Sequence, residues 1–533
     1  MGGGLLQLVA YGAQDVYLTG NPQITFWKVT YRRHTNFAME SIEQTFNGQA
    51  DFGRRVQCTV SRNGDLAYRT YLQVTLPEIN QDDANASGKA VYARWLDCPG
   101  EQLISNVEVE IGGQRIDKQY GDWMHIWNQL TLTSEQEEGY NKMIGNTSQL
   151  CYLTDPDFAD VQSACGGSTV PGQVCAPRNA LPETTLYVPL QFWFCRNPGL
   201  ALPLIALQYH EVKITLELRP LDECLFAVDG INNSTKKVTA AYQKSLVAAS
   251  LYVDYVFLDT DERRRMAQNP HEYLIEQLQF TGGESIGSSS NKIKLNFNHP
   301  CKELVFVVQP DAHVNYCDAF DGTKLTCKAL GAQPFNYTDA IDALPNSLLA
   351  FVTDPAEAGH DGVSTSTGGD EKVISGGLFQ QSMHVVSGDG KDLSNVADGN
   401  DGKLTDAASF VLAETAKNMH CWGENPVVTA KLQLNGQDRF SEREGSYFDL
   451  VQPFQHHTRH PDTGINVYSF ALRPEEHQPS GTCNFSRIDN ATLQLVVSAA
   501  AVASSATAKV RVYATNYNVL RIMSGMGGLA YSN

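Results

Sequence analysis

Residues 212–218 read Val-Lys-Ile-Thr-Leu-Glu-Leu, and apolar and polar side chains alternate along this stretch until Arg219 and Pro220 interrupt it. Successive side chains of a β-strand point to opposite faces, so the alternation indicates a strand with one buried face. The same period of two recurs along the chain, at residues 107–111, 292–297, 431–434 and 509–513. Gly-Gly at 112–113 and Asn-Gly at 435–436 end two of these stretches and predict tight hairpin turns.

Helical patterns are few. Apolar residues between Trp123 and Leu130 are spaced three or four apart, and Asp122 before them is a candidate N-cap. Residues 261–268 are short, charged and helix-prone, and they stop near Pro270. Many short strands with rare helices predict an all-β protein built from sandwiches or barrels.

The composition excludes several classes of protein. With 42% hydrophobic and 19% charged residues the chain is not a disordered one. Its 40 basic and 59 acidic residues give a net charge of −19, whereas a nucleic-acid-binding chain would have a basic stripe and a high pI.

The 12 cysteines form no CxxC pair, so we expect most of them to be reduced and buried. No apolar run reaches the ~18 residues of a membrane span, and no basic residue precedes Lys28, so we expect synthesis in the cytosol.

The chain resembles itself. Four segments of the first half have counterparts in the second half, and the counterparts follow in the same order: 44–49 with 279–284, 109–115 with 432–438, 197–218 with 478–497, and 252–256 with 510–513. Chance similarity would scramble that order, so we infer a tandem repeat. Each copy has about eight strong strand segments, and one Greek-key sandwich or one jelly roll accounts for this size and pattern.

The repeat predicts two tandem all-β domains, Greek-key sandwiches or jelly rolls, with long inserted loops and few short helices. We place an N-terminal arm at 1–26, the first β domain at 27–259, a linker at 260–271, the second β domain at 272–524, and a C-terminal tail at 525–533. A segment of about 310–425 is a long loop insertion rich in Gly, Asp, Ser and Thr. The Gly-rich ends at 2–4 and 525–528 are expected to be flexible tails suited to docking.

Motifs that carry chemistry are weak. Residues 283–287 match GxSxG, but further serines and a strand follow where the nucleophile elbow needs a helix, so a loop is expected. His456, His457 and His460 cluster between strands, and we interpret them as a solvated loop rather than a metal site. Residues 398–402 begin like a calcium loop, but the glycine comes one position early.

Arg263, Arg264 and Arg265 are expected to pair with carboxylates between the two domains, in preference to nucleic acid. No catalytic, cofactor-binding or metal-binding residue is predicted, and no cofactor. The sequence therefore predicts that the protein is not an enzyme.

Several long motifs are specific to one family. They are LVAYGAQDVYLTGNPQITF at 8–26, IGGQRIDK at 111–118, PHEYLIEQLQFT at 270–281, LNGQDRF at 434–440 and NYNVLRIMSGMGGLA at 516–530. With these the chain resembles the major capsid proteins of nucleocytoplasmic large DNA viruses, most of all those of algal viruses. The motifs lie in both halves and near both ends, so the resemblance covers nearly the whole chain.

The resemblance implies an all-β fold of two tandem eight-stranded jelly rolls, and it implies a structural role. It implies a homotrimer whose six jelly rolls form a pseudo-hexagonal capsomer, and capsomers that tile the outer icosahedral shell of the virion after assembly in the host cytoplasm. The implied partners are the chain itself, neighbouring capsomers, and minor capsid and penton proteins at the inner face and vertices. No direct contact with nucleic acid is implied, and contact with an internal viral membrane would be indirect.

Two other functions remain open from the residues alone, a carbohydrate-binding β-sandwich and a jelly-roll enzyme; the first predicts a monomer that binds sugar, and the second lacks a credible site. Asn-x-Ser/Thr sequons occur along the chain. Some members of the resembled family carry glycans on outer loops, which makes Asn336, in the long insertion, the candidate for glycosylation. Asn484 and Asn490 are expected to be buried.

Overall fold

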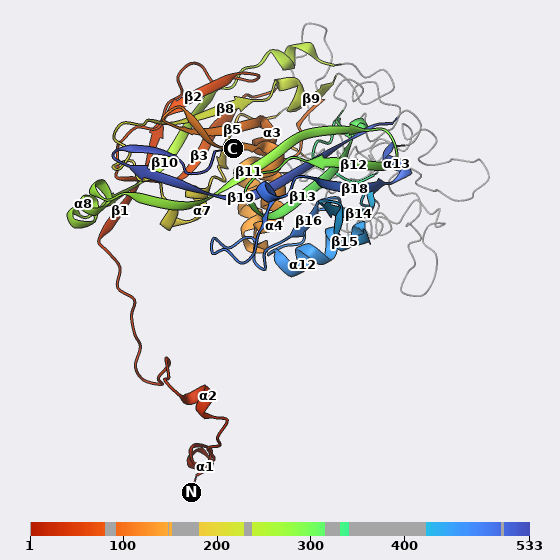
Figure 1. The fold of residues 1–533 in the computed structure, drawn as a ribbon. Coiled ribbons are helices and arrows are strands. Elements are labelled where there is room, and N and C mark those ends of the chain that lie inside the picture. Colours follow the sequence, from red (N-terminus) through yellow and green to blue (C-terminus); the bar gives the residue numbers. More distant parts are fainter. Residues whose placement is uncertain are drawn as a thin grey trace, which may run out of the picture.

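The computed structural model describes residues 2–79, 92–147, 149–151, 181–228, 237–314, 331–339, 423–502 and 506–532. These residues are mainly β-strands, arranged in four larger sheets and one two-stranded sheet (Figure 1). Most of the predicted insertion, the calcium-like stretch at 398–402 included, lies outside the described residues.

The first half forms two antiparallel four-stranded sheets. One has the order β1 (Phe37–Gln44), β10 (Ala248–Leu258), β3 (Leu66–Leu76) and β7 (Thr184–Pro189). The other has the order β2 (Arg55–Thr59), β8 (Val212–Leu218), β5 (Ile104–Ile111) and β6 (Gln114–Tyr120). A separate pair consists of β4 (Tyr92–Trp95) and β9 (Leu225–Val228).

The second half repeats this plan. One sheet has the order β11 (His271–Ile286), β19 (Ala508–Met523), β13 (Pro300–Pro310) and β16 (Asn466–Ser469). β17 (Cys483–Asn484) pairs with β13, and β20 (Met526–Leu529) pairs with β19. The facing sheet has the order β12 (Ser290–Leu295), β18 (Ala491–Val497), β14 (Val427–Leu434) and β15 (Gln437–Glu444).

The two halves share one topology. With β4, β9, β17 and β20 set aside, the strands of each half can be numbered one to eight along the chain. Both halves then have the strand orders 1-8-3-6 and 2-7-4-5. This is the jelly-roll arrangement, so the predicted double jelly roll is confirmed. Three of the four similarities in the sequence include equivalent strands, and the fourth begins at the last residue of β1 (44–49) and lies within β11, the counterpart of β1 (279–284), which explains why their order was preserved.

The alternation of apolar and polar side chains along the strands determines which residues form the two hydrophobic cores. In β8, Val212, Ile214, Leu216 and Leu218 are buried within the first sandwich, while Lys213 and Glu217 are half-buried on its other side. A second core fills the sandwich of the other half. The predicted hairpin turns also form, since Gly112 and Gly113 have φ of +58° and +83°, and Asn435 and Gly436 have +51° and +81°.

The helices between the strands are short. Those predicted are α4 (Gly121–Thr131) and α8 (Thr260–Gln268); α5 (Ser134–Ile144) was not predicted. The body also contains α3 (Pro99–Leu103), α7 (Trp193–Arg196), α12 (Gln452–His456) and α13 (Ala499–Val502). Helix α12 directly follows a π-helical turn at Tyr447–Val451. Short 3₁₀ turns lie at Pro198–Leu200, Leu221–Glu223, Thr239–Gln243, Asp311–His313 and Phe485–Arg487. Among the described residues no helix is long and apolar enough to cross a membrane.

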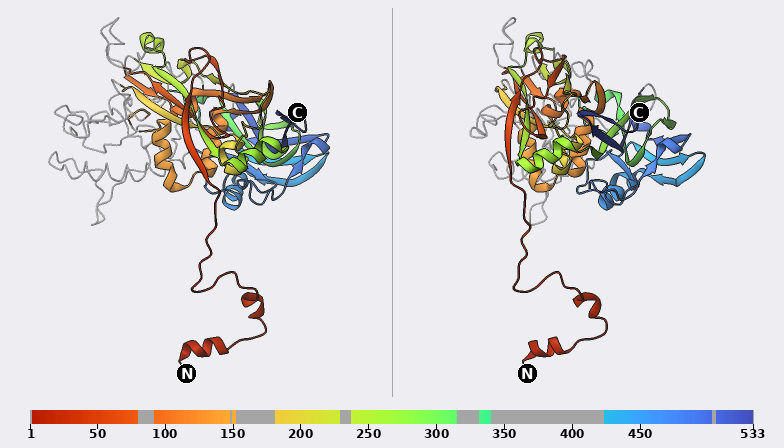
Figure 2. Two further views of the ribbon diagram at one scale, coloured as in Figure 1. Left: turned by 90° about the vertical axis from the view of Figure 1, so that its left-hand side faces the viewer. Right: turned by 60° about the vertical axis from the view of Figure 1, so that its left-hand side comes forward.

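The two ends of the chain differ. The N-terminal arm carries α1 (Gly3–Val9) and α2 (Val16–Thr19) and projects away from the body in every view (Figures 1 and 2). The Gly-rich C-terminal segment is not the flexible tail that we expected. It forms β20, and His210 Nδ1 of the first half lies 2.9 Å from the carbonyl oxygen and 3.1 Å from the amide nitrogen of Gly527, so its tautomer decides which of the two it hydrogen-bonds. The described cysteines are all free, and six of the seven are buried.

Candidate functional site at the joint between the two halves

The two jelly rolls meet at helix α4. Trp123, Ile126 and Trp127 of this helix belong to one buried apolar cluster with Val305 and Val307 of β13, Val467 of β16 and Tyr513 of β19. The helix can begin close to the sheet because Gly121 has no side chain. A Cβ at this residue would lie 2.1 Å from the carbonyl oxygen of Ile104, a backbone atom that cannot move aside easily. The helix is therefore held between the two halves.

The prediction that Asp122 caps this helix was wrong. The N-cap residue is Tyr120, and its side chain makes no capping bond. Asp122 lies in the first turn and accepts hydrogen bonds from Arg219 of the first half (3.0 Å) and from Arg511 of β19. One carboxylate thus joins an arginine from each jelly roll.

Glu276 on β11 is a second ionic link. Its Oε2 lies 3.0 Å from Nη1 of Arg196 and 2.8 Å from Nζ of Lys302. The Arg196 guanidinium, which comes from the first half, also stacks on Trp127, 4.3 Å from the ring centroid. Because the side chain of Lys302 is fully buried, its charge depends on Glu276 for compensation.

Glu303, His457 and Glu475 form a third cluster. His457 Nε2 lies 3.1 Å from Glu303 Oε2, and Nδ1 lies 2.9 Å from Glu475 Oε1. Burial alone lowers the pKa of His457, but its hydrogen bonds to the two carboxylates and their charges outweigh burial and raise this pKa to about 9. Burial tends to raise the pKa of Glu303, but His457 keeps it below its usual value. The imidazole is therefore a buried cation at neutral pH.

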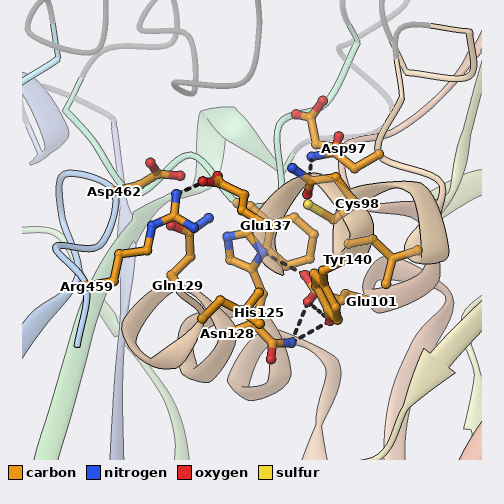
Figure 3. Close-up of a pocket in the computed structure, with 15 residues that line it drawn as sticks. Asp97, Cys98, Glu101, His125, Asn128, Gln129, Glu137, Tyr140, Arg459 and Asp462 are labelled. Carbon is orange, nitrogen blue, oxygen red and sulfur yellow. Dashed lines mark hydrogen bonds and ion pairs between the residues drawn. The ribbon is translucent and has the colours of Figure 1, made fainter. Parts of the chain in front are cut away.

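A small polar pocket lies beside α4, with side chains from both halves around it (Figure 3). Glu101 of α3 is buried at its edge, and its carboxylate accepts hydrogen bonds from Asn128 Nδ2 (2.9 Å) and from the Tyr140 hydroxyl (2.6 Å). His125 Nδ1 lies 2.7 Å from Glu101 Oε2. Burial by itself lowers the pKa of His125, but Glu101 outweighs burial and raises it.

The second half closes this pocket. The ring of Phe335 stacks on His125, with centroids 4.1 Å apart, and Arg459 is 2.5 Å from Glu137 of α5. The contacts cross between segments that are far apart in the chain, 322 residues for Arg459 and Glu137. The joint therefore combines an apolar cluster with buried charges, and this combination holds two rigid sandwiches in one relative orientation.

The structure corrects the interpretation of the histidine cluster. We predicted a solvated loop, but the side chain of His457 is completely buried, whereas His460 is exposed. Charged residues beside an apolar run were a signal that we did not use. Lys302 and Glu303 directly precede Leu-Val-Phe-Val-Val in β13, where a buried strand would be expected to lack charges.

Other predicted residues lie away from the joint. The GxSxG stretch ends strand β11 and is followed by β12, so it is neither the loop that we expected nor an elbow before a helix. Arg263 of helix α8 pairs with Asp65 of the first half at 2.9 Å. Asn484 and Asn490 are exposed, so their predicted burial was wrong.

Asn336, the glycosylation candidate, is only 4% exposed. Its Nδ2 donates to Gln333 Oε1 at 2.7 Å, and its Oδ1 accepts from the Thr338 amide at 3.1 Å. A glycan would replace one of the two hydrogens on Nδ2, and this atom now lies in a buried side chain.

Comparisons with known proteins agree with this architecture. The family described as major capsid protein N-terminus matches residues 25–259, and the family described as large eukaryotic DNA virus major capsid protein matches residues 262–528. The chain is 73% identical over 533 residues to the major capsid protein of Phaeocystis pouchetii virus and 67% identical over 596 residues to that of Chrysochromulina ericina virus, and both alignments cover 100% of each chain.

Solved structures show the same fold. A chain of the PBCV-1 virus capsid is 34% identical, and the match covers 96% of this chain and 100% of that one with a TM-score of 0.60. The Faustovirus major capsid protein superposes with a TM-score of 0.61 at 13% identity, over 96% of this chain and 94% of that one.

Proposed function

Because this chain belongs to the family of large eukaryotic DNA virus major capsid proteins, we propose that three copies associate into a pseudo-hexagonal capsomer and that capsomers tile an icosahedral shell. The protein is a structural component of the virion capsid and not an enzyme. The observation that carries the proposal is the identical strand order of the two halves. Three chains with two equivalent sandwiches each present six similar units around a closed ring.

The joint supports the same proposal. A hexagonal outline requires that the two sandwiches of each chain keep one orientation, and the cluster on α4 with the Asp122 and Glu276 links supplies this constraint. We take residues 27–259 and 272–524 as the two domains, with 260–271 as their linker. The net charge of −19 favours a shell that encloses a genome without binding it.

Light scattering tests the trimer. Purified full-length chain should have a mass of about three times 58.6 kDa, independent of protein concentration over the measured range. Electron microscopy of the same sample should show particles with six lobes. A stable monomer that binds sugar would contradict the proposal and favour a carbohydrate-binding sandwich.

The N-terminal arm is the segment that we propose for contacts within the shell. Its large apolar side chains are more than half exposed, with Tyr17, Ile24 and Phe26 at 90% or more. Exposed apolar surface of this kind marks an interaction site. We propose that the arm docks on neighbouring capsomers or on minor capsid and penton proteins during assembly in the host cytoplasm, and that any contact with an internal membrane is indirect.

Glycosylation at Asn336 is a proposal that mass spectrometry tests. Because the side chain is buried, the sugar would have to be attached before this segment folds. If Asn336 is the acceptor, the intact mass of the virion protein exceeds 58.6 kDa by the mass of a glycan, and Asn336→Gln removes the excess. An unmodified mass contradicts the proposal. An excess mass that persists in Asn336→Gln assigns the glycan to another residue. The exposed Asn484 and Asn490 are the controls, and the same substitution at each of them tests this outcome.

A further inference from the structure

The pocket beside α4 holds a donor set that no part of the capsid role requires. Cys98, Glu101 and His125 are all buried, and one potential ligand atom from each lies within 4.8 Å of the other two. They are the only such group in the part of the chain that the structure describes. Thiolate, carboxylate and imidazole together are typical ligands of zinc. We propose that these three residues bind one divalent metal ion of the zinc class.

The backbone conformation of Cys98 is unusual, and it supports a metal site at this residue. Cys98 has φ of +49° and ψ of +63°, the left-handed conformation, directly before Pro99 and helix α3. Residues other than glycine lose roughly 1–2 kcal/mol in this conformation. Such strain tends to be retained at functional positions, where the surrounding structure imposes it.

The pocket also contains polar atoms that lack partners. His125 is 4% exposed, and its Nε2 has no hydrogen-bond partner among the described residues; the same is true of Oε1 of Gln129. Figure 3 shows the His125 ring between Glu101 on one side and Gln129 and Arg459 on the other. The cavity there, about 40 Å³, is large enough for a water molecule. An ion held by Nδ1 would lie on the Glu101 side of the ring, so Nε2 would keep the remaining imidazole proton and could donate it to a water in this cavity.

Charge favours a dication in this place. Glu101 and the thiolate of Cys98 would together neutralise two positive charges, so the loaded site would carry no net charge when buried. Burial, followed by the charges of Glu101 and Asp97, holds the pKa of the Cys98 thiol well above its usual value in the metal-free chain. A coordinated metal reverses this effect, because the ion itself stabilises the thiolate.

Binding requires two protons to leave. The metal replaces the thiol proton of Cys98 and the proton shared by His125 Nδ1 and Glu101 Oε2, and both protons pass to solvent. The 2.7 Å contact between these two atoms must then widen to about 3.3 Å, the separation of two ligands on a tetrahedral ion with bonds of about 2.0 Å. Asn128 and Tyr140 keep their hydrogen bonds to the other carboxylate oxygen and orient it.

Cobalt is the probe for the experiment, because a thiolate bound to Co²⁺ gives a charge-transfer absorption band in the near ultraviolet. Full-length protein treated with a chelator and then titrated with Co²⁺ should develop this band and saturate at one ion per chain, and Zn²⁺ should abolish it. The melting temperature should rise when Zn²⁺ is added. Cys98→Ser should lose the band and the stabilisation. Cys58→Ser, the same change at another fully buried free cysteine, should keep both.

Zinc K-edge absorption spectroscopy of the wild-type chain makes the test independent of how the variants fold. The proposal expects one sulfur at about 2.3 Å and nitrogen or oxygen ligands at about 2.0–2.2 Å. A first shell without sulfur would overturn it, as would a band that persists in folded Cys98→Ser. Absence of both the band and the zinc-dependent melting shift in the wild type would show that the cluster is only a hydrogen-bonded part of the joint.

Discussion

Replacing Glu276 with alanine should lower the free energy of unfolding by about 3–5 kcal/mol. The carboxylate neutralises Arg196 of the first jelly roll and Lys302 of the second, at 3.0 Å and 2.8 Å. Without it the ammonium group of Lys302 stays completely buried and has lost its 2.8 Å ion pair. Chemical denaturation followed by tryptophan fluorescence measures the change, since Trp127 lies within the same cluster.

Glu272 is the matched control for this change. It lies on the same strand and pairs with Arg521 at 2.8 Å, but both side chains are more than half exposed. An exposed pair contributes about 0–1 kcal/mol, so Glu272→Ala should have little effect. Glu276→Leu combined with Lys302→Met should recover most of the stability, because the buried pair is then replaced by apolar side chains. Equal effects of Glu276→Ala and Glu272→Ala would contradict the role assigned to Glu276.

Replacing His457 with alanine should also destabilise the chain by about 3–5 kcal/mol at pH 7, because the fully buried carboxylate of Glu303 loses the imidazole cation that lies 3.1 Å away. His456→Ala is the control. The Nδ1 atom of the neighbouring His456 lies 3.1 Å from the carbonyl oxygen of Leu472 in an exposed setting, so the loss of this ring should matter much less. Unfolding midpoints of the two variants at one pH give the comparison.

The same histidine predicts a pH dependence. Its pKa is raised from 6.5 to about 9 by folding, so the folded state holds a proton that the unfolded state has lost between these values. The stabilisation is therefore complete below pH 6.5 and disappears as the pH rises through 9. Denaturation midpoints of the wild type should fall between pH 6.5 and 9, and those of His457→Ala should fall less. Parallel curves for the two proteins would show that His457 does not carry this dependence.

Much of the fold could be predicted because its signals are local. The alternation in 212–218 becomes strand β8, with all four of its apolar side chains buried, since side-chain direction in a strand changes at every residue. Helix α5 was missed although its ends carry recognisable signals. Acidic residues occupy its first turn, Lys142 its last turn, and Gly145 follows it in the left-handed conformation with φ of +81°.

The candidate sites were less predictable. Asp122 follows the pattern of a helix cap, but its partners lie 97 and 389 residues away along the chain. His457 lies in a stretch that looks like a polar loop, and only the approach of Glu303 and Glu475 makes it a buried cation. The grouping of Cys98, Glu101 and His125 likewise depends on the turn at Cys98 and on the packing of α3 against α4.

The sequence by itself determined that this protein consists of two similar all-β domains, because the period-two pattern and the ordered repeat are properties of neighbouring residues and of their copies. The motifs that it shares with one family implied that these domains are jelly rolls. Only the tertiary structure decided how the two jelly rolls are joined and which charged side chains are buried between them. The physical reason is that burial and charge pairing arise between residues distant in the chain. The free energy of a buried charge therefore depends on partners that no local pattern identifies.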